Sequence, residues 1–163
     1  MKTELQGLID ECTSELEDIK TKIQELKPFD KTRAYLTKYA LLKASGTIEF
    51  VCRSIITDYF KPFNIPQVDR YLLNTVQKNA SCRSFSEMHA LLDKFDDDWS
   101  KRFKTNINER KDCDKLIQSS NSLVKNRNAF AHGGKTTATF EDIYNYYLDC
   151  LELVKYFDSV VHK

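Results

Sequence analysis

Glycine and proline are scarce in this sequence, with 4 glycines and 3 prolines among 163 residues. This scarcity argues against a fold of many short strands joined by turns, because such turns depend on these two residue types. The abundant residues, Leu, Lys, Glu, Ile and Asp, favour long helices instead. The length fits one domain, residues 1–163, that hides about two-thirds of its unfolded surface. We therefore predict a single all-α domain, an antiparallel bundle of about five to six helices.

Paired cysteines are also lacking. The 5 cysteines stand singly at positions 12, 52, 82, 113 and 150, with no C-x-x-C pair and in an odd total. This arrangement argues against both a disulfide framework and a zinc site. We expect reduced, mostly buried thiols, and we predict neither a metal ion nor a cofactor.

No charge of one sign dominates, since 25 Lys and Arg residues face 24 Asp and Glu residues and the formal net charge is +1. The chain thus has no global basic field, and any binding of nucleic acid must be local. The start of the chain does not resemble a signal peptide, and no apolar run approaches the roughly 20 residues that a membrane span needs. We expect a soluble, cytoplasmic protein that does not contact a membrane.

Apolar residues recur at alternating three- and four-residue spacings, which predicts amphipathic helices. The predicted helices cover residues 3–27, 30–61, 66–79, 87–107, 108–132 and 139 onward. The first of them, within residues 1–27, is an additional N-terminal amphipathic helix. Asp30 is a candidate N-cap, and Thr139 with Asp142 resembles a capping box. The second helix is the most apolar, and we expect it at the centre of the bundle.

The stretch KNRNAFAHGG, residues 125–134, is the strongest candidate for chemistry. Ideal helix geometry places Arg127 and His132 about 140° apart around the axis, while Asn128 shares the face of His132. Arg127 and His132 can meet if the arginine side chain sweeps across, if the helix loosens before Gly133, or if a second copy faces the first. A purely structural alternative is that basic side chains in a last turn favour the helix dipole and cap its carbonyls.

The segment RNAFAH resembles the R-x4-6-H signature of the HEPN superfamily of small helical domains, including the polar residue after the arginine. The upstream helix LLKASGTIEFVCRSIITDYF is similar to that of the RiboL-PSP type of HEPN domain, whose central helix carries an acidic residue, here Glu49. The resemblance covers about residues 30–163. It implies a helical bundle that dimerises so that two motifs line one cleft.

The resemblance further implies a metal-independent endoribonuclease used in toxin–antitoxin or antiviral defence systems. Carried over to this sequence, Arg127 stabilises the phosphate, Asn128 is a positioning residue and His132 is the acid/base. Such a site implies RNA as substrate, a homodimer and an antitoxin or defence protein as partner. Gly134 stands where one subgroup has a tyrosine whose modification silences the toxin, so that subgroup is disfavoured.

Glu49 has two interpretations. It orients Arg127 or His132, or it is a structural residue that is exposed or pairs with Arg53, four residues further along the helix. Lys125, Lys135 and Arg53 are candidate RNA-binding residues, although Arg53 also fits an ordinary surface position. Two other functions are open at this stage. One is a non-catalytic HEPN module that binds a partner protein or nucleotide and regulates an effector, and the other is a plain helical scaffold whose first helix is an oligomerisation arm.

Overall fold

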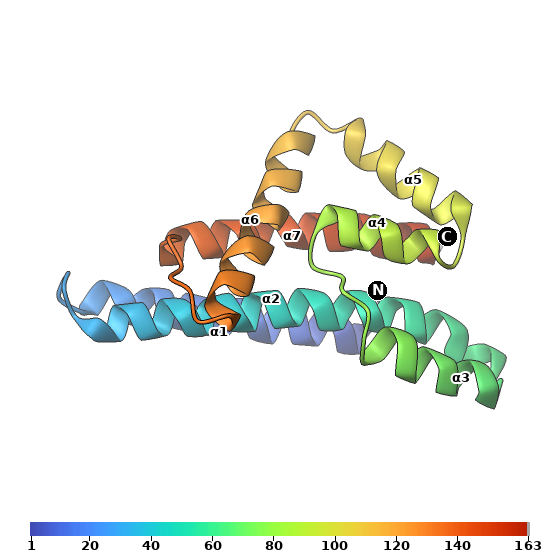
Figure 1. Ribbon diagram of the computed structural model, residues 1–163, viewed down its shortest axis with the longest axis horizontal. Coiled ribbons are helices and arrows are strands. Elements are labelled where there is room, and N and C mark those ends of the chain that lie inside the picture. The colour runs from blue at the N-terminus through green and yellow to red at the C-terminus, as the bar shows by residue number, and fades with distance from the viewer. Residues whose placement is uncertain (163) are drawn as a thin grey trace.

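The computed structural model describes residues 1–162. Seven α-helices and no strand lie within these residues, so the prediction of an all-α fold is confirmed (Figure 1). The helices are α1 (Thr3–Glu25), α2 (Lys31–Phe60), α3 (Pro66–Leu72), α4 (Phe85–Asp93), α5 (Asp97–Asn108), α6 (Cys113–Ala131) and α7 (Phe140–Val161). A short 3-10 turn, Lys61–Phe63, follows α2, and a π-helical turn, Leu73–Gln77, continues α3.

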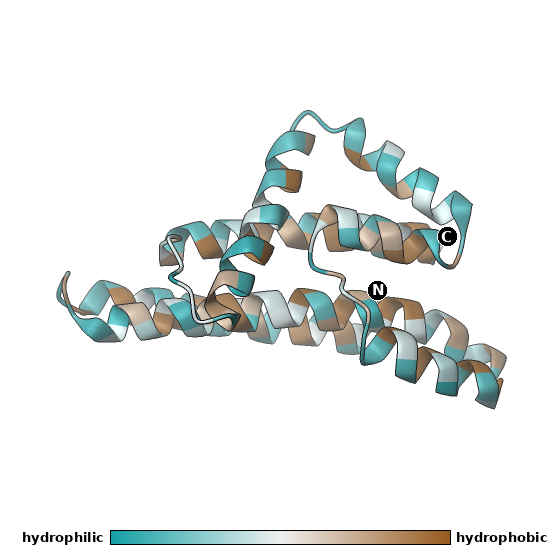
Figure 2. Ribbon diagram, in the orientation of Figure 1, coloured by the Kyte–Doolittle hydropathy of each residue, from teal (hydrophilic) through white to brown (hydrophobic). Residues whose placement is uncertain are grey.

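Helix α2 is the central helix, as its apolar sequence predicts. It packs against α1, α6 and α7, and the two long helices α1 and α2 lie side by side along the long axis. Leu41, Ile48 and Ile55 of α2 and Tyr147 and Phe157 of α7 are fully buried. Full burial of one such aliphatic side chain contributes about 1.5–3 kcal/mol relative to exposure. Figure 2 shows that α5, in contrast, consists mainly of hydrophilic residues.

Local capping fixes where several helices begin. The Asp30 side chain accepts a hydrogen bond from the Thr32 backbone N–H at 2.8 Å, so the predicted N-cap of α2 is confirmed. The predicted capping box is confirmed as well: the Thr139 hydroxyl accepts from the Asp142 N–H, and the Asp142 carboxylate accepts from the Thr139 N–H. The second bond is 2.8 Å long and places the start of α7.

The prediction of one helix across residues 87–107 is wrong. The chain leaves α4 at Lys94 and re-enters a helix at Asp97 because Asp96 caps α5. The Asp96 carboxylate accepts hydrogen bonds from the N–H groups of Asp98 and Trp99, at 2.7 and 3.0 Å. This break raises the number of helices above the predicted five to six. Helix α6 also begins later than predicted, at Cys113 rather than residue 108.

The cysteines agree with the prediction of reduced, mostly buried thiols. All five are free, and only Cys113 is not buried. Within residues 1–162, no helix combines the length and the apolar character that crossing a membrane requires. The cytoplasmic location remains a prediction.

Candidate functional site

The motif lies at the C-terminal end of α6, where the backbone closes in a Schellman turn. Gly133 has a φ of 78°, a left-handed conformation that glycine adopts without strain. The Gly133 N–H donates to the Phe130 carbonyl at 3.1 Å, and the Gly134 N–H donates to the Ala129 carbonyl at 2.8 Å. A Cβ atom on Gly134 would lie 2.9 Å from the Ala129 oxygen. Both glycines are therefore required by the geometry of this helix end.

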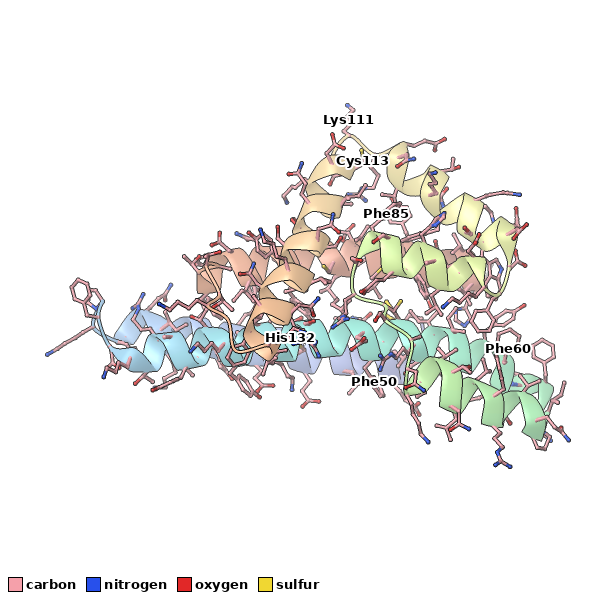
Figure 3. All side chains as sticks on the ribbon, in the orientation of Figure 1. Phe50, Phe60, Phe85, Lys111, Cys113 and His132 are labelled. Atoms are coloured by element: carbon pink, nitrogen blue, oxygen red, sulfur yellow. The ribbon has the colours of Figure 1, made fainter. Side chains whose placement is uncertain are left out.

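His132 has already left the helix. Its φ of −95° and ψ of 18° make it the C-cap residue, and its side chain is exposed. No hydrogen bond or ion pair joins its imidazole to another residue in the part of the chain that the structure describes. In Figure 3 it lies at the end of α6 next to α2, far from Lys111 at the opposite end of α6.

Arg127 and Asn128 form the other half of the motif. The Arg127 guanidinium donates one hydrogen bond, 3.2 Å long, from Nη1 to the Asn128 Oδ1. Both side chains are half-buried, and no carboxylate pairs with Arg127 among residues 1–162. The guanidinium thus keeps donors for an anion, and Asn128 contacts the arginine rather than the histidine whose face it shares.

The two candidate RNA-binding lysines, Lys125 and Lys135, lie close to the motif in sequence and are exposed. Lys125 precedes Arg127 on α6, and Lys135 follows the glycine turn. A third basic residue, which the sequence did not single out, joins them from α2. The Nζ of Lys38 lies 5.7 Å from the ring centroid of Phe130, a residue inside the motif. Lys38 of α2 and Lys135 of the following loop therefore lie near the end of α6, and Lys125 lies about two turns before it on the same helix.

Asn126 belongs to the site but was not predicted from the sequence. Its side chain is 9 % exposed, and its Oδ1 accepts hydrogen bonds from the N–H groups of Thr137 and Ala138, at 3.3 and 3.4 Å. Its Nδ2 donates to the Ser122 carbonyl at 2.9 Å. Asn126 thereby fastens the segment after His132 to α6. Its position in the sequence gives one sign of this role: Asn126 comes three residues after Leu123, on the buried face of α6.

Glu49 and Arg53 lie in a different place. The Glu49 Oε1 accepts a hydrogen bond from the Arg53 Nη2 at 2.8 Å and forms a 3.5 Å ion pair with the Nε of Arg83, which is 8 % exposed. Within residues 1–162 Glu49 makes no hydrogen bond to Arg127 or His132. Lys38, the α2 residue beside Phe130, precedes Glu49 by 11 residues, about 16 Å along the axis.

Arg53 is not an ordinary surface arginine. It donates hydrogen bonds to the carbonyls of Ala80 and Gln77, at 2.5 and 3.1 Å, in addition to its bond with Glu49. These contacts hold α2 to the segment that leads into α4. The guanidinium is therefore occupied inside the chain, and the structure does not bring Arg53 to Lys125 and Lys135.

The remaining histidines have structural contacts. His89 shares a 3.0 Å hydrogen bond between its Nε2 and the Ser100 hydroxyl, which joins α4 to α5. His162 lies 3.0 Å from a carboxylate oxygen of Asp158. Among residues 1–162, no group of three or more His, Cys, Asp or Glu side chains is placed to hold a metal ion. His132 is thus the one histidine of this part of the chain whose ring is without a polar partner.

The fold and this site define the chain as a small all-α domain with a half-buried Arg–Asn pair and an exposed histidine at a helix end. A model of the RiboL-PSP-HEPN family matches residues 8–163. The chain therefore belongs to the RiboL-PSP-HEPN family, and the resemblance found in the sequence is confirmed. The matched region begins within α1, earlier than the region of resemblance expected from the sequence. Comparison with curated proteins and with solved structures gives no significant match.

Proposed function

We propose that this protein is a metal-independent endoribonuclease that works as a homodimer and cleaves single-stranded or loop RNA. The observation that carries the proposal is the exposed, unbonded imidazole of His132, five residues after a guanidinium that has no carboxylate partner. A histidine buried in the core with both nitrogens bonded would have contradicted it. Membership of the family adds support, since HEPN domains include ribonucleases with this motif.

RNA carries its own nucleophile, so the protein needs only to move protons and stabilise charge. His132 removes the proton from a 2′-hydroxyl, and the oxygen then forms a bond to the adjacent phosphorus. Arg127 stabilises the negative charge that gathers on the phosphate oxygens, and Asn128 holds its guanidinium. The bond to the 5′-oxygen breaks, and that oxygen takes a proton from an imidazolium. The products are a 2′,3′-cyclic phosphate end and a 5′-hydroxyl end.

A second copy of the chain would bring Arg127 and His132 to the same phosphate from opposite sides. Within one chain the two residues point in different directions around α6. An exposed apolar stripe on α2, beside the end of α6, offers a surface for that copy. Near the end of α6 it is formed by Tyr35, Tyr39 and Leu42, at four- and three-residue spacings and with exposures of 65 %, 47 % and 43 %. Phe50, 49 % exposed, lies eight residues further along α2.

Cleavage of a labelled RNA by purified protein tests the assignment. We expect His132→Ala to lower the rate by about 10²–10⁴-fold, the usual contribution of a general acid or base. We expect Arg127→Ala to lower it comparably because an uncompensated phosphorane charge is costly. Arg70→Ala is the matched control, since Arg70 is exposed on α3 and has no polar partner within residues 1–162. Equal rates for all four proteins would overturn the proposal. The alternative function, a non-catalytic HEPN module that binds a partner, would then be favoured.

Mixing the two inactive variants tests the homodimer. If each site takes its arginine from one copy and its histidine from the other, a mixed dimer contains one complete site. Random exchange of subunits then restores about a quarter of the wild-type activity, because half of the dimers are mixed and each has one of two sites intact. No recovery beside an active wild-type protein would contradict the composite site.

We further propose a role in a toxin–antitoxin or antiviral defence system, in which an antitoxin or defence protein is the partner. This role follows from family membership rather than from a contact in the chain. A gene for such a partner next to the gene of this protein would support it.

A further inference from the structure

A groove of about 550 Å³ lies next to the motif, between the start of α2 and the segment that follows His132. Arg33 and Lys38 line it from α2, and Gly134 and Lys135 line it from the other side. Because Asn126 fastens that segment to α6, the far wall of the groove is held in place. The groove is therefore a formed feature beside the candidate site.

The lining of this groove carries three cations and no carboxylate. The Arg33 Nη1 donates to the carbonyls of Ile23 and Leu26, at 2.6 and 3.1 Å, which fixes the guanidinium at the turn between α1 and α2. Its Nε and Nη2 make no hydrogen bond within residues 1–162. Lys38 and Lys135 likewise have no ion-pair partner in the described part of the chain. Asp30 interacts electrostatically with Arg33 from outside the groove lining, but it forms no ion pair with it. Three cations without an ion-pair partner in the described residues around one concave surface attract an anion.

Two contacts connect this groove with the motif. The Nζ of Lys38 lies over the Phe130 ring, and Phe130 stands between Arg127 and His132 in the sequence. Gly134, which lines the groove, is bonded through its N–H to Ala129, another motif residue. An extended polyanion bound at Arg127 and His132 would therefore continue into the groove.

The groove is suited to binding the phosphate backbone of RNA rather than its bases. The aromatic residue of its lining, Phe140, is 5 % exposed, so no residue of the lining offers an open ring on which a base could stack. Lysine and arginine side chains bind phosphate oxygens without regard to the base. We propose that this groove binds a backbone phosphate of the RNA on one side of the scissile phosphate, with Arg33, Lys38 and Lys135 as its ligands. The proposal rests on the proposed ribonuclease function.

The test measures binding without cleavage. A labelled single-stranded oligonucleotide with 2′-O-methyl groups has no free 2′-hydroxyl nucleophile, so the wild-type protein can be used. Its affinity is measured by fluorescence anisotropy over a range of salt concentrations, for the wild type and for the double variant Lys38→Gln/Lys135→Gln. Glutamine keeps the first two methylene groups of the lysine side chain and a polar end, and removes the charge. The matched control is Lys104→Gln/Lys111→Gln, whose lysines are exposed and lie on α5 and just before α6.

Each phosphate contact with a single strand contributes about 0.7 to the slope of log affinity against log salt. We expect the double variant to lower the magnitude of that slope by about 0.7, the contribution of the one phosphate that the groove binds, and the control to leave it unchanged. With cleavable RNA, the same variant should raise KM at constant kcat, because the contact acts before and during the reaction alike. A slope equal to that of the wild type overturns the groove proposal.

Two further outcomes separate this proposal from the ribonuclease proposal. If the wild type does not cleave RNA but the slope falls in the double variant, the groove is supported and the catalytic assignment fails. If the variant loses binding of uridine monophosphate but keeps the wild-type slope for the oligonucleotide, the groove is a mononucleotide site and the proposal is overturned.

Discussion

Replacing Asn126 with alanine should destabilise the protein measurably, because its side chain joins α6 to the segment after His132. The change removes the acceptor of two backbone N–H groups, those of Thr137 and Ala138. A buried donor that loses its acceptor costs about 1–3 kcal/mol. We take about 1 kcal/mol for each of these two bonds, because hydrogen bonds of this length are weak. The sum is about 2 kcal/mol, which corresponds to a fall in Tm of roughly 4–8 °C for a chain of this size.

Urea unfolding followed by far-ultraviolet circular dichroism measures this change in the free energy of unfolding. Asn121→Ala is the matched control: Asn121 is exposed on the same helix and makes no hydrogen bond through its side chain within residues 1–162. We expect that control to lie within about 0.5 kcal/mol of the wild type. If Asn126→Ala and Asn121→Ala have the same stability, the segment after His132 is not held by Asn126 and the reasoning is refuted.

Gly133→Ala should lower the free energy of unfolding by about 1 kcal/mol, because an alanine is strained at a φ of 78°, whereas Gly133→Asn should cost less. Urea unfolding of both variants measures the difference, and an alanine variant as stable as the wild type would contradict the strain. Hydrogen bonds from the Thr139 hydroxyl and N–H lower the pKa of Asp142. Its folded-state pKa is thus below the unfolded value, so its stabilisation is complete at neutral pH and is lost as the pH falls through the folded pKa. The stability difference between the wild type and Asp142→Asn should therefore close in acid, and a difference that is constant with pH would show that the charge is irrelevant.

The helical nature of this protein and several of its helix boundaries were predictable because their causes are local. An apolar stripe, an N-cap such as Asp30 and a capping box such as Thr139 with Asp142 each involve residues within a few positions of one another. The break between α4 and α5 was missed although it is local too. The apolar pattern continues across the break, whereas the Asp96 carboxylate accepts hydrogen bonds from the N–H groups of Asp98 and Trp99 and starts a new helix.

The sequence also identified the candidate site, since the residue types and spacing of Arg127, Asn128 and His132 are visible without any structure. It did not identify the surroundings of that site. Glu49 is far from the motif in the sequence. Whether it orients a motif residue or has a structural role is decided by its contacts with Arg53 and Arg83, which only the structure shows. Lys38 lies more than ninety positions before Phe130, and no spacing rule relates them.

The sequence by itself thus determined the helical class, the family and the chemical groups at the end of α6, because each depends on short stretches of chain. Only the tertiary structure showed which lysines lie near that end and that Arg53 makes its hydrogen bonds inside the chain. It also showed that Asn126 fixes the segment that forms one wall of the groove. These features depend on how α2, α6 and the segment after His132 meet, and that meeting is set by the packing of whole helix faces rather than by neighbouring residues.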